Sequence, residues 1–208
     1  MTKPILYGAD YSVYVRIARM TLEEKGVGYE LIPLDIFAAE GIPSWYLEHH
    51  PFGRIPAFEH DGFRLFETNA IARYVDEAFD GPALQPADPR GRARMGQMTG
   101  MLDAYGYRAM VWDVAVERLE KAEPDESLIA DGLSQAETVL RVLTALKVPG
   151  PWLLGDQVTL ADLHAAPIIA YFLKAADGQK LMAGFAEIQA WWDRITDRQA
   201  FGVTEKAD

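Results

Sequence analysis

The chain has 208 residues, half of them hydrophobic and a quarter charged, which is enough to bury a core in one large domain or two modest ones. Its formal net charge of -11 would repel a nucleic-acid backbone, and no basic stripe offsets it, so we expect no nucleic-acid partner. Cysteine is absent, which excludes disulfides, cysteine-ligated zinc and a thiol nucleophile supplied by the protein itself.

The N-terminal residues lead straight into a strand-like segment, with no apolar leader and no cleavage site. Nowhere do about 18 apolar residues follow one another, so we expect no membrane span. A cytoplasmic protein is the expectation from these two observations.

The first 80 residues alternate between strand-like and helix-like segments. In chain order the predicted elements are a strand at 5–7, a helix at 12–25, a strand at 29–34, an irregular segment at 36–50, hairpin strands at 56–59 and 63–66, and a helix at 68–79. Pro33 suggests a sheet edge for the second strand, and Asp61-Gly62 is a strong hairpin-turn signal. The order βαβ-ββα predicts a small mixed sheet with a parallel pair and an antiparallel hairpin.

Composition changes after residue 80. Residues 81–89 are rich in proline and glycine, which indicates a linker. The predicted helices that follow lie at 90–120, 126–147, 159–174 and 183–199. The third begins with Thr159 and, three residues later, Asp162, the spacing of a capping box, and Pro167 inside it should kink that helix.

Two sequence runs and this capping box carry a resemblance to a known family. HPFGRIPA at residues 50–57 and LFETNAI at residues 65–71 closely resemble the glutathione-binding core of soluble glutathione transferases, and the box TLAD at residues 159–162 resembles a capping element of their helical domain. The resemblance runs from residue 5 to about residue 200. It implies fold class α/β plus all-α: a thioredoxin-like domain at 1–80, a linker at 81–89 and a helical-bundle domain at 90–208.

The resemblance also implies where glutathione binds. A cis bond at Ile55-Pro56 would expose the backbone of Ile55 to the cysteinyl part of the tripeptide. The helix start at Thr68 would take the γ-glutamyl carboxylate, and Glu67 its amino group; Thr68 should also serve as an ordinary N-cap. Relatives often hold the glycine carboxylate with Lys or His where this chain has Gly41 and Ile42, which leaves Arg54, or else His49 or His50, for that charge.

Ser12 is the expected activator of the glutathione thiol, because it follows the first strand and begins the first helix. Its spacing from the strand, and to Arg16, resembles the theta and delta classes, which use a serine. Tyr11 is the second choice, and a plain N-cap role for Ser12 stays open. A thiol with a pKa of about 8.5 needs about 2.7 kcal/mol of preferential thiolate stabilisation for a shift of two pKa units.

The family resemblance extends to a second substrate and a second subunit. Tyr14, Tyr105, Arg108 and Trp112 are the candidate contacts for a flat, hydrophobic or aromatic electrophile, although aromatic residues at helical spacing are more often core. Phe52, an apolar residue in a loop, suggests a homodimer. Adjacent His49 and His50 rarely ligate one ion together, so we expect no metal.

The expected activity is therefore glutathione conjugation of an electrophile or a related glutathione-dependent ether cleavage, dehalogenation, isomerisation or peroxide reduction. The alternative is a non-catalytic interaction or ligand-binding module on the same fold, since a fold alone does not determine function.

Overall fold

A computed structural model describes residues 2–205 of the chain, and its contacts divide the chain into two compact units. The first contains the residues up to Pro82 together with those from Gln199 onward, and the second is Ala83–Arg198. The break between them lies within the stretch that composition suggested as a linker, while residues 199–205 pack with the first unit. Among residues 2–205, none of the helices combines the length and apolar character needed to cross a bilayer.

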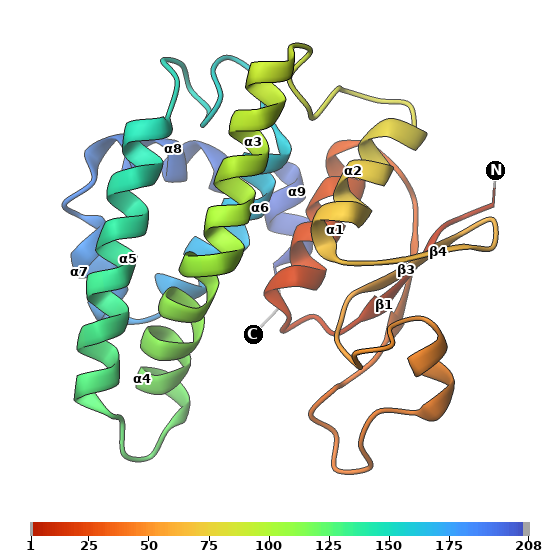
Figure 1. Ribbon diagram of the computed structural model, residues 1–208, viewed down its shortest axis with the longest axis horizontal. Coiled ribbons are helices and arrows are strands. Elements are labelled where there is room, and N and C mark those ends of the chain that lie inside the picture. The colour runs from red at the N-terminus through yellow and green to blue at the C-terminus, as the bar shows by residue number, and fades with distance from the viewer. Residues whose placement is uncertain (1, 206–208) are drawn as a thin grey trace. The chain divides into compact units, whose positions relative to one another are not determined.

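The first unit is built on a four-stranded mixed sheet (Figure 1). Its strands are β1 (Ile5–Gly8), β2 (Glu30–Pro33), β3 (Ala57–His60) and β4 (Phe63–Phe66), in the order β2-β1-β3-β4. β1 and β2 are parallel, whereas β3 pairs antiparallel with both β1 and β4. The predicted parallel pair, the antiparallel hairpin and the edge position of the strand that contains Pro33 are all confirmed.

The turn between β3 and β4 has the backbone that its sequence predicts. Asp61 and Gly62 have φ values of 50° and 80°, both in the left-handed region that a two-residue primed turn requires. Glycine adopts this conformation without steric cost, and aspartate tolerates it better than most residues.

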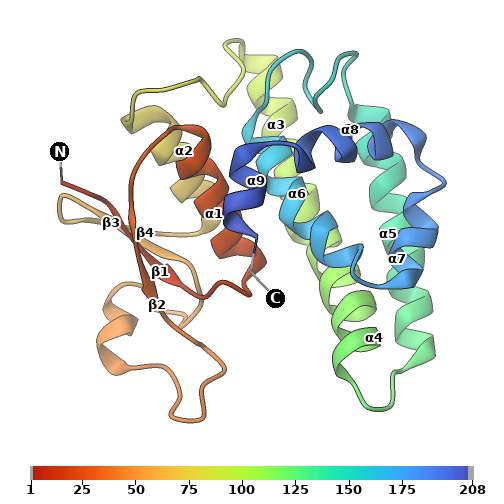
Figure 2. The ribbon, with the colours of Figure 1, turned by 180° about the vertical axis from the view of Figure 1, so that it is seen from behind.

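Two helices cover one face of the sheet, α1 (Val13–Glu24) and α2 (Thr68–Ala78) (Figures 1 and 2). Apolar side chains at helical spacing on both helices meet inward-facing residues of β1 and β3 in one core, which contains Leu6, Val15, Ala18, Leu22, Phe58, Ile71 and Val75. A short helix, η1 (Ser44–Glu48), occupies part of the segment expected to be irregular. At the end of the chain α9 (Gln199–Thr204) packs beside α1, as both views show (Figures 1 and 2).

The second unit is a bundle of helices, in which residues 147–159 form one connection and the other connections are shorter. Its elements are α3 (Pro89–Met101), η2 (Leu102–Gly106), η3 (Arg108–Val116), α4 (Glu117–Glu120), α5 (Glu126–Leu146), α6 (Leu160–Phe172), α7 (Ala176–Met182) and α8 (Ala186–Thr196). The predicted helices at 90–120, 126–147 and 159–174 are confirmed to within two residues. The helix predicted at 183–199 was too long, because it spans only 186–196, and α7 and α9 were missed. The non-helical backbone of Phe185 separates α7 from α8.

The long helical stretch from Pro89 to Glu120 is not uniformly α-helical. Over η2 and η3 the backbone hydrogen bonds reach five residues back, as from the amide of Tyr107 to the carbonyl of Leu102. Such π-helical pairing is rare and places more residues in each turn. Side chains that would share one stripe of an ideal α-helix therefore diverge along this segment.

The capping box at the start of α6 is present as predicted. Asp162 is fully buried, and its carboxylate accepts the backbone amide and the hydroxyl of Thr159, each at 2.8 Å. The same carboxylate accepts the amide of Leu153 and the indole N–H of Trp191, also at 2.8 Å. The local cap therefore also joins α6 to α8 and to the loop before α6.

Candidate active site

The sheet register gathers the candidate residues of the first unit at one edge. Tyr7 of β1 pairs with Ala57 of β3, and Ala57 pairs with Phe66 of β4. The chain therefore leaves β1, enters β3 and leaves β4 at the same end of the strands. This line of strand ends is the sheet edge that carries the candidate residues. Ser12 follows β1, Ile55-Pro56 precedes β3, and Glu67-Thr68 follows β4. Candidate residues far apart in the sequence thus follow or precede strand ends that lie side by side.

The turn before β3 contains the expected cis bond, between Ile55 and Pro56. The ladder pairing of β3 starts at Ala57, so Ile55 lies two residues before the strand, at a bend in the chain. The phenolic hydroxyl of Tyr46 donates to the carbonyl of Arg54 at 2.6 Å and anchors the turn from below. An extended peptide can pair with backbone groups that are exposed beside a sheet.

The junction of β4 and α2 has an unusual backbone at Glu67. Its φ of 70° is one of two positive values at non-glycine residues among those the structure describes. Such a conformation costs of order 1–3 kcal/mol and tends to occur at functional sites. The expected N-cap at Thr68 was wrong: Glu67 is the N-cap, and Thr68 is the first helical residue. The helical backbone therefore begins after Glu67, and the exposed carboxylate of Glu67 makes no capping hydrogen bond.

Ser12 is the N-cap of α1, as predicted. Its Oγ accepts a hydrogen bond from the amide of Val15 at 3.3 Å, while its own amide donates to the carbonyl of Ala9 at 3.1 Å. The helix start brings a partial positive charge to the same place. Since the hydroxyl oxygen acts as the acceptor toward the helix, its proton remains available for a separate acceptor.

Tyr11, the other candidate donor, has its hydroxyl engaged. The phenol donates to Asp35 Oδ1 at 2.7 Å, and burial and this hydrogen bond raise the pKa of Tyr11 to about 12. The same interaction, with the amide of Phe37, lowers the pKa of Asp35. Sequence reasoning missed Asp35, because the contact joins residues 24 positions apart and no local pattern signals it.

His50 and Arg54 have different environments. His50 is 3% exposed, packs against Phe66 with ring centroids 4.9 Å apart, and has a buried Nδ1 without a hydrogen-bond partner. Burial lowers its pKa below 6.5, so the imidazole is neutral near pH 7. Arg54 is exposed and carries a permanent charge. Nε2 of His49 lies 3.3 Å from Oε2 of Glu59.

The remaining candidates lie on α1 and in the helical unit. Tyr14 is half-buried in the first turn of α1, and Trp112 is half-buried in η3. Tyr105 lines a groove between α3, η2 and α5, and the guanidinium of Arg108 is paired with Asp113 at 2.6 Å. Among residues 2–205, no three His, Cys, Asp or Glu side chains are grouped closely enough to hold a metal ion.

Comparison with known proteins finds similarity to glutathione transferases along almost the whole chain. Residues 3–77 match the glutathione S-transferase N-terminal domain family, and residues 104–199 match the glutathione S-transferase C-terminal domain family. The chain is 30% identical over 205 residues to glutathione S-transferase F9 of Arabidopsis thaliana, covering 96% of this chain and 94% of the relative.

Solved structures agree with these matches. Poplar glutathione transferase F1 aligns with a TM-score of 0.87 and 27% identity, covering 98% of this chain and 97% of that one. The theta class glutathione S-transferase of the citrus canker pathogen Xanthomonas axonopodis pv. citri, solved with glutathione bound, aligns with a TM-score of 0.83 and 26% identity over 100% of this chain and 99% of that one. On the evidence of the two domain matches, the similar relatives and the thioredoxin-like and helical units, the chain belongs to the soluble glutathione transferase family and is a glutathione transferase enzyme.

Proposed function

We propose that this transferase binds glutathione along the sheet edge and activates its thiol with Ser12 for attack on a hydrophobic or aromatic electrophile. The observation that carries the proposal is the register that brings Ser12, Ile55 and Glu67 to one edge. The plant relatives belong to the phi class and argue against the expected theta or delta placement, so the proposal concerns the use of a serine, not that class.

The tripeptide would lie along the turn before β3. The backbone of Ile55 would pair with the cysteinyl residue in the manner of an added strand. The γ-glutamyl carboxylate would lie at the N-terminus of α2, whose first amides have no intrahelical partner and carry partial positive charge. The exposed carboxylate of Glu67 would receive the γ-glutamyl amino group, since a charge-assisted hydrogen bond is stronger than a neutral one.

Ser12 would stabilise the thiolate that forms beside the start of α1. A hydrogen bond to a charged group contributes about 1.5–3 kcal/mol, close to the roughly 2.7 kcal/mol needed for two pKa units. The oxygen of Ser12 already accepts from Val15, which leaves its proton free to point toward sulfur. The hydroxyl of Tyr11 is directed at a carboxylate instead, which favours Ser12 over Tyr11.

For the glycine carboxylate we propose Arg54. A charged, exposed guanidinium can bind a carboxylate through two parallel hydrogen bonds, whereas a buried neutral imidazole cannot. His50 would then shape the turn from within. Replacing Arg54 by Gln should weaken the binding of glutathione but not of its glycine ethyl ester, and calorimetry with both ligands compares these losses.

For the electrophile, Tyr14 is the contact proposed on the first unit and Trp112 the candidate on the helical unit, and both side chains are partly accessible. Tyr105 and Arg108 are not part of this proposal, because Tyr105 lines the groove beside α5 and the guanidinium of Arg108 is paired with Asp113. An aryl halide such as 1-chloro-2,4-dinitrobenzene is the natural first substrate to assay.

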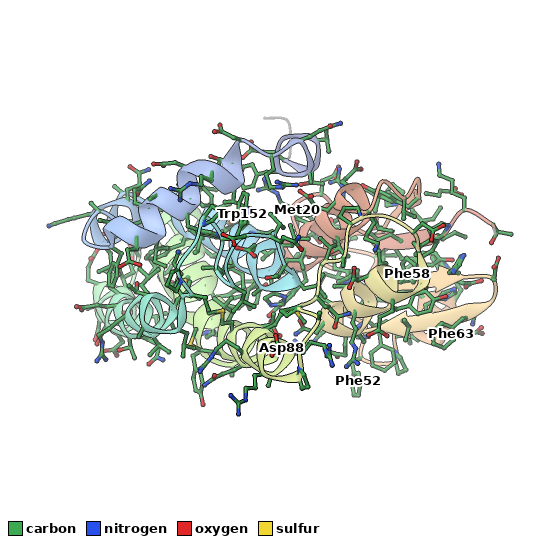
Figure 3. All side chains as sticks on the ribbon, turned by 90° about the horizontal axis from the view of Figure 1, so that it is seen from above. Met20, Phe52, Phe58, Phe63, Asp88 and Trp152 are labelled. Atoms are coloured by element: carbon green, nitrogen blue, oxygen red, sulfur yellow. The ribbon has the colours of Figure 1, made fainter. Side chains whose placement is uncertain are left out.

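We also propose a homodimer in which Phe52 of one copy enters the groove between α3, η2 and α5 of the other. Phe52 is 73% exposed and lies at the outer edge of the first unit, unlike the interior Phe58 (Figure 3). The groove has a volume of 580 Å³ and is lined by apolar groups of Met101, Tyr105 and Val139, which suit an aromatic ring. Sedimentation of Phe52→Ser should show a monomer; an unchanged dimer would reject this contact.

Substitution of Ser12 by alanine tests the central assignment. We expect turnover with the aryl halide to fall by about 100-fold, the effect of roughly 2.7 kcal/mol, while glutathione binding changes little. Wild-type turnover in this variant would reject the serine mechanism. Absence of glutathione binding by the unmodified protein would instead favour a non-catalytic interaction or ligand-binding role.

A further inference from the structure

Tyr11 and Asp35 lie in two loops that leave neighbouring parallel strands. Gly8 at the end of β1 pairs with Pro33 at the end of β2, and the amide of Leu34 donates to the carbonyl of Gly8 at 3.1 Å. The loop 9–12, which contains Ser12, therefore starts beside the loop that begins with Leu34 and Asp35. Any contact between these loops influences where Ser12 is held.

Asp35 and Phe37 of the second loop both contact Tyr11 of the first. The hydroxyl of Tyr11 donates to Asp35 Oδ1 at 2.7 Å, and the same oxygen accepts the amide of Phe37 at 2.9 Å. The rings of Tyr11 and Phe37 also lie against each other, with centroids 5.8 Å apart. Asp35 thus connects the residue before Ser12 to the backbone of the second loop.

The opposite side of the Ser12 loop is held by a separate interaction. Asp10 Oδ1 accepts a hydrogen bond from Arg19 Nη1 at 2.7 Å, and Arg19 lies two turns along α1. The two residues that precede Ser12 therefore make separate contacts, Asp10 with α1 and Tyr11 with the loop after β2. Between these contacts, Ser12 keeps its N-cap geometry toward Val15.

We propose that Tyr11 is a positioning residue, which acts through Asp35 to hold Ser12 at the thiol and does not itself touch sulfur. This inference rests on the proposed role of Ser12. A hydroxyl that must meet a thiolate within about 3 Å loses catalytic value when its loop moves by a fraction of that distance. Loss of either partner of the Tyr11–Asp35 contact should therefore have the same consequence.

A double-mutant cycle with Tyr11→Phe and Asp35→Ala tests the coupling. Each single variant is expected to lower kcat about fivefold and to raise the apparent pKa of the bound thiol, while the glutathione KM stays within about twofold. The double variant should be no worse than either single one, because the two substitutions remove one shared contact. Asp35→Asn retains an acceptor for the phenol and should restore kcat to within about twofold of the wild type.

Tyr74→Phe is a matched control, since its hydroxyl contacts His60 Nδ1 at 2.9 Å away from the Ser12 loop, and its kcat should equal that of the wild type. Full activity of Asp35→Ala beside a damaged Tyr11→Phe would overturn the proposal, since the phenol would then act directly on sulfur. Additive losses, or no loss in either variant, would also overturn it. Ser12→Ala separates the two proposals. Full activity of Ser12→Ala would reject the serine mechanism. An impaired Ser12→Ala together with additive losses in the Tyr11–Asp35 cycle would reject only the role of Tyr11.

Discussion

Removal of the buried carboxylate of Asp162 should destabilise the helical unit strongly. In Asp162→Ala the amides of Leu153 and Thr159 and the indole N–H of Trp191 lose an acceptor that lies at 2.8 Å from each. An unsatisfied buried donor costs about 1–3 kcal/mol, and removal of one partner of a buried charged network costs about 3–5 kcal/mol. We expect a loss of about 4 kcal/mol, a large part of the roughly 5–15 kcal/mol that stabilises a folded protein.

Asp162→Asn should cost less, and the structure gives the reason. Each carboxylate oxygen accepts two donors, so an amide nitrogen always faces two of them. When that nitrogen replaces Oδ2, the hydroxyl of Thr159 can rotate to accept from it, and only the amide of Thr159 stays unsatisfied. The expected cost is then that of a single donor, about 1–3 kcal/mol.

Urea unfolding followed by tryptophan fluorescence measures both losses, because Trp191 is buried beside the carboxylate. Asp193→Ala is the control. Among the contacts described, the exposed side chain of this α8 aspartate accepts a hydrogen bond only from Gln189, so its loss should change stability by less than about 0.5 kcal/mol. A loss below about 1 kcal/mol in Asp162→Ala, or equal losses in Asp162→Ala and Asp162→Asn, would refute the hydrogen-bond argument.

Three further predictions concern the first unit. Lys25→Met should lower the free energy of unfolding by about 3–5 kcal/mol, measured with urea, because the carboxylate of Asp76 would lose its buried cation. Lys25 Nζ donates to the side chain and carbonyl of Asp76 and to the carbonyl of Pro82 at 3.0–3.2 Å. Stability should recover in Lys25→Met/Asp76→Asn. Burial lowers the pKa of His50, so on acidification the unfolded chain binds a proton at this imidazole before the folded chain does. The free energy of unfolding should therefore fall as pH drops below about 6.5. His50→Asn should flatten this pH dependence, and an unchanged dependence would contradict the argument. Glu67→Gln should weaken glutathione binding about tenfold by calorimetry while stability stays within about 0.5 kcal/mol, and equal affinity would remove Glu67 from the site.

Several elements could be predicted because their signals are local. The alternation of short apolar runs with helical spacing predicted the four strands and the helices α1 and α2, and Asp61-Gly62 predicted a turn whose two residues have positive φ. Ser12 and the pair Thr159 and Asp162 predicted their caps for the same reason, since a cap involves residues three positions apart. Thr68 was the exception, because the conformation of Glu67 moved the cap by one residue.

Other features have no local signal. The division of residues 176–196 into α7 and α8 and the π-helical pairing of η2 and η3 were not predicted, because helix propensity signals neither feature. The attachment of α9 to α1 rests on Arg16, whose guanidinium donates to the carbonyl of Phe201 at 3.1 Å and lies 4.2 Å from the centre of its ring. A sequence read from one end cannot reveal that a residue 185 positions away supplies the partner.

By itself, the sequence determined the periodicity of each element, the turn chemistry, the caps and the motifs that mark a glutathione transferase, since these depend on residues within about one helical turn of each other. The tertiary structure alone decided which of Ser12 and Tyr11 keeps a free hydroxyl, because the acceptor of Tyr11 is Asp35 on a neighbouring strand's loop. It likewise decided that His50 is buried and neutral while Arg54 is exposed. Burial and long-range hydrogen bonding are properties of the folded arrangement, so they set the chemistry of these side chains only once the sheet edge has assembled.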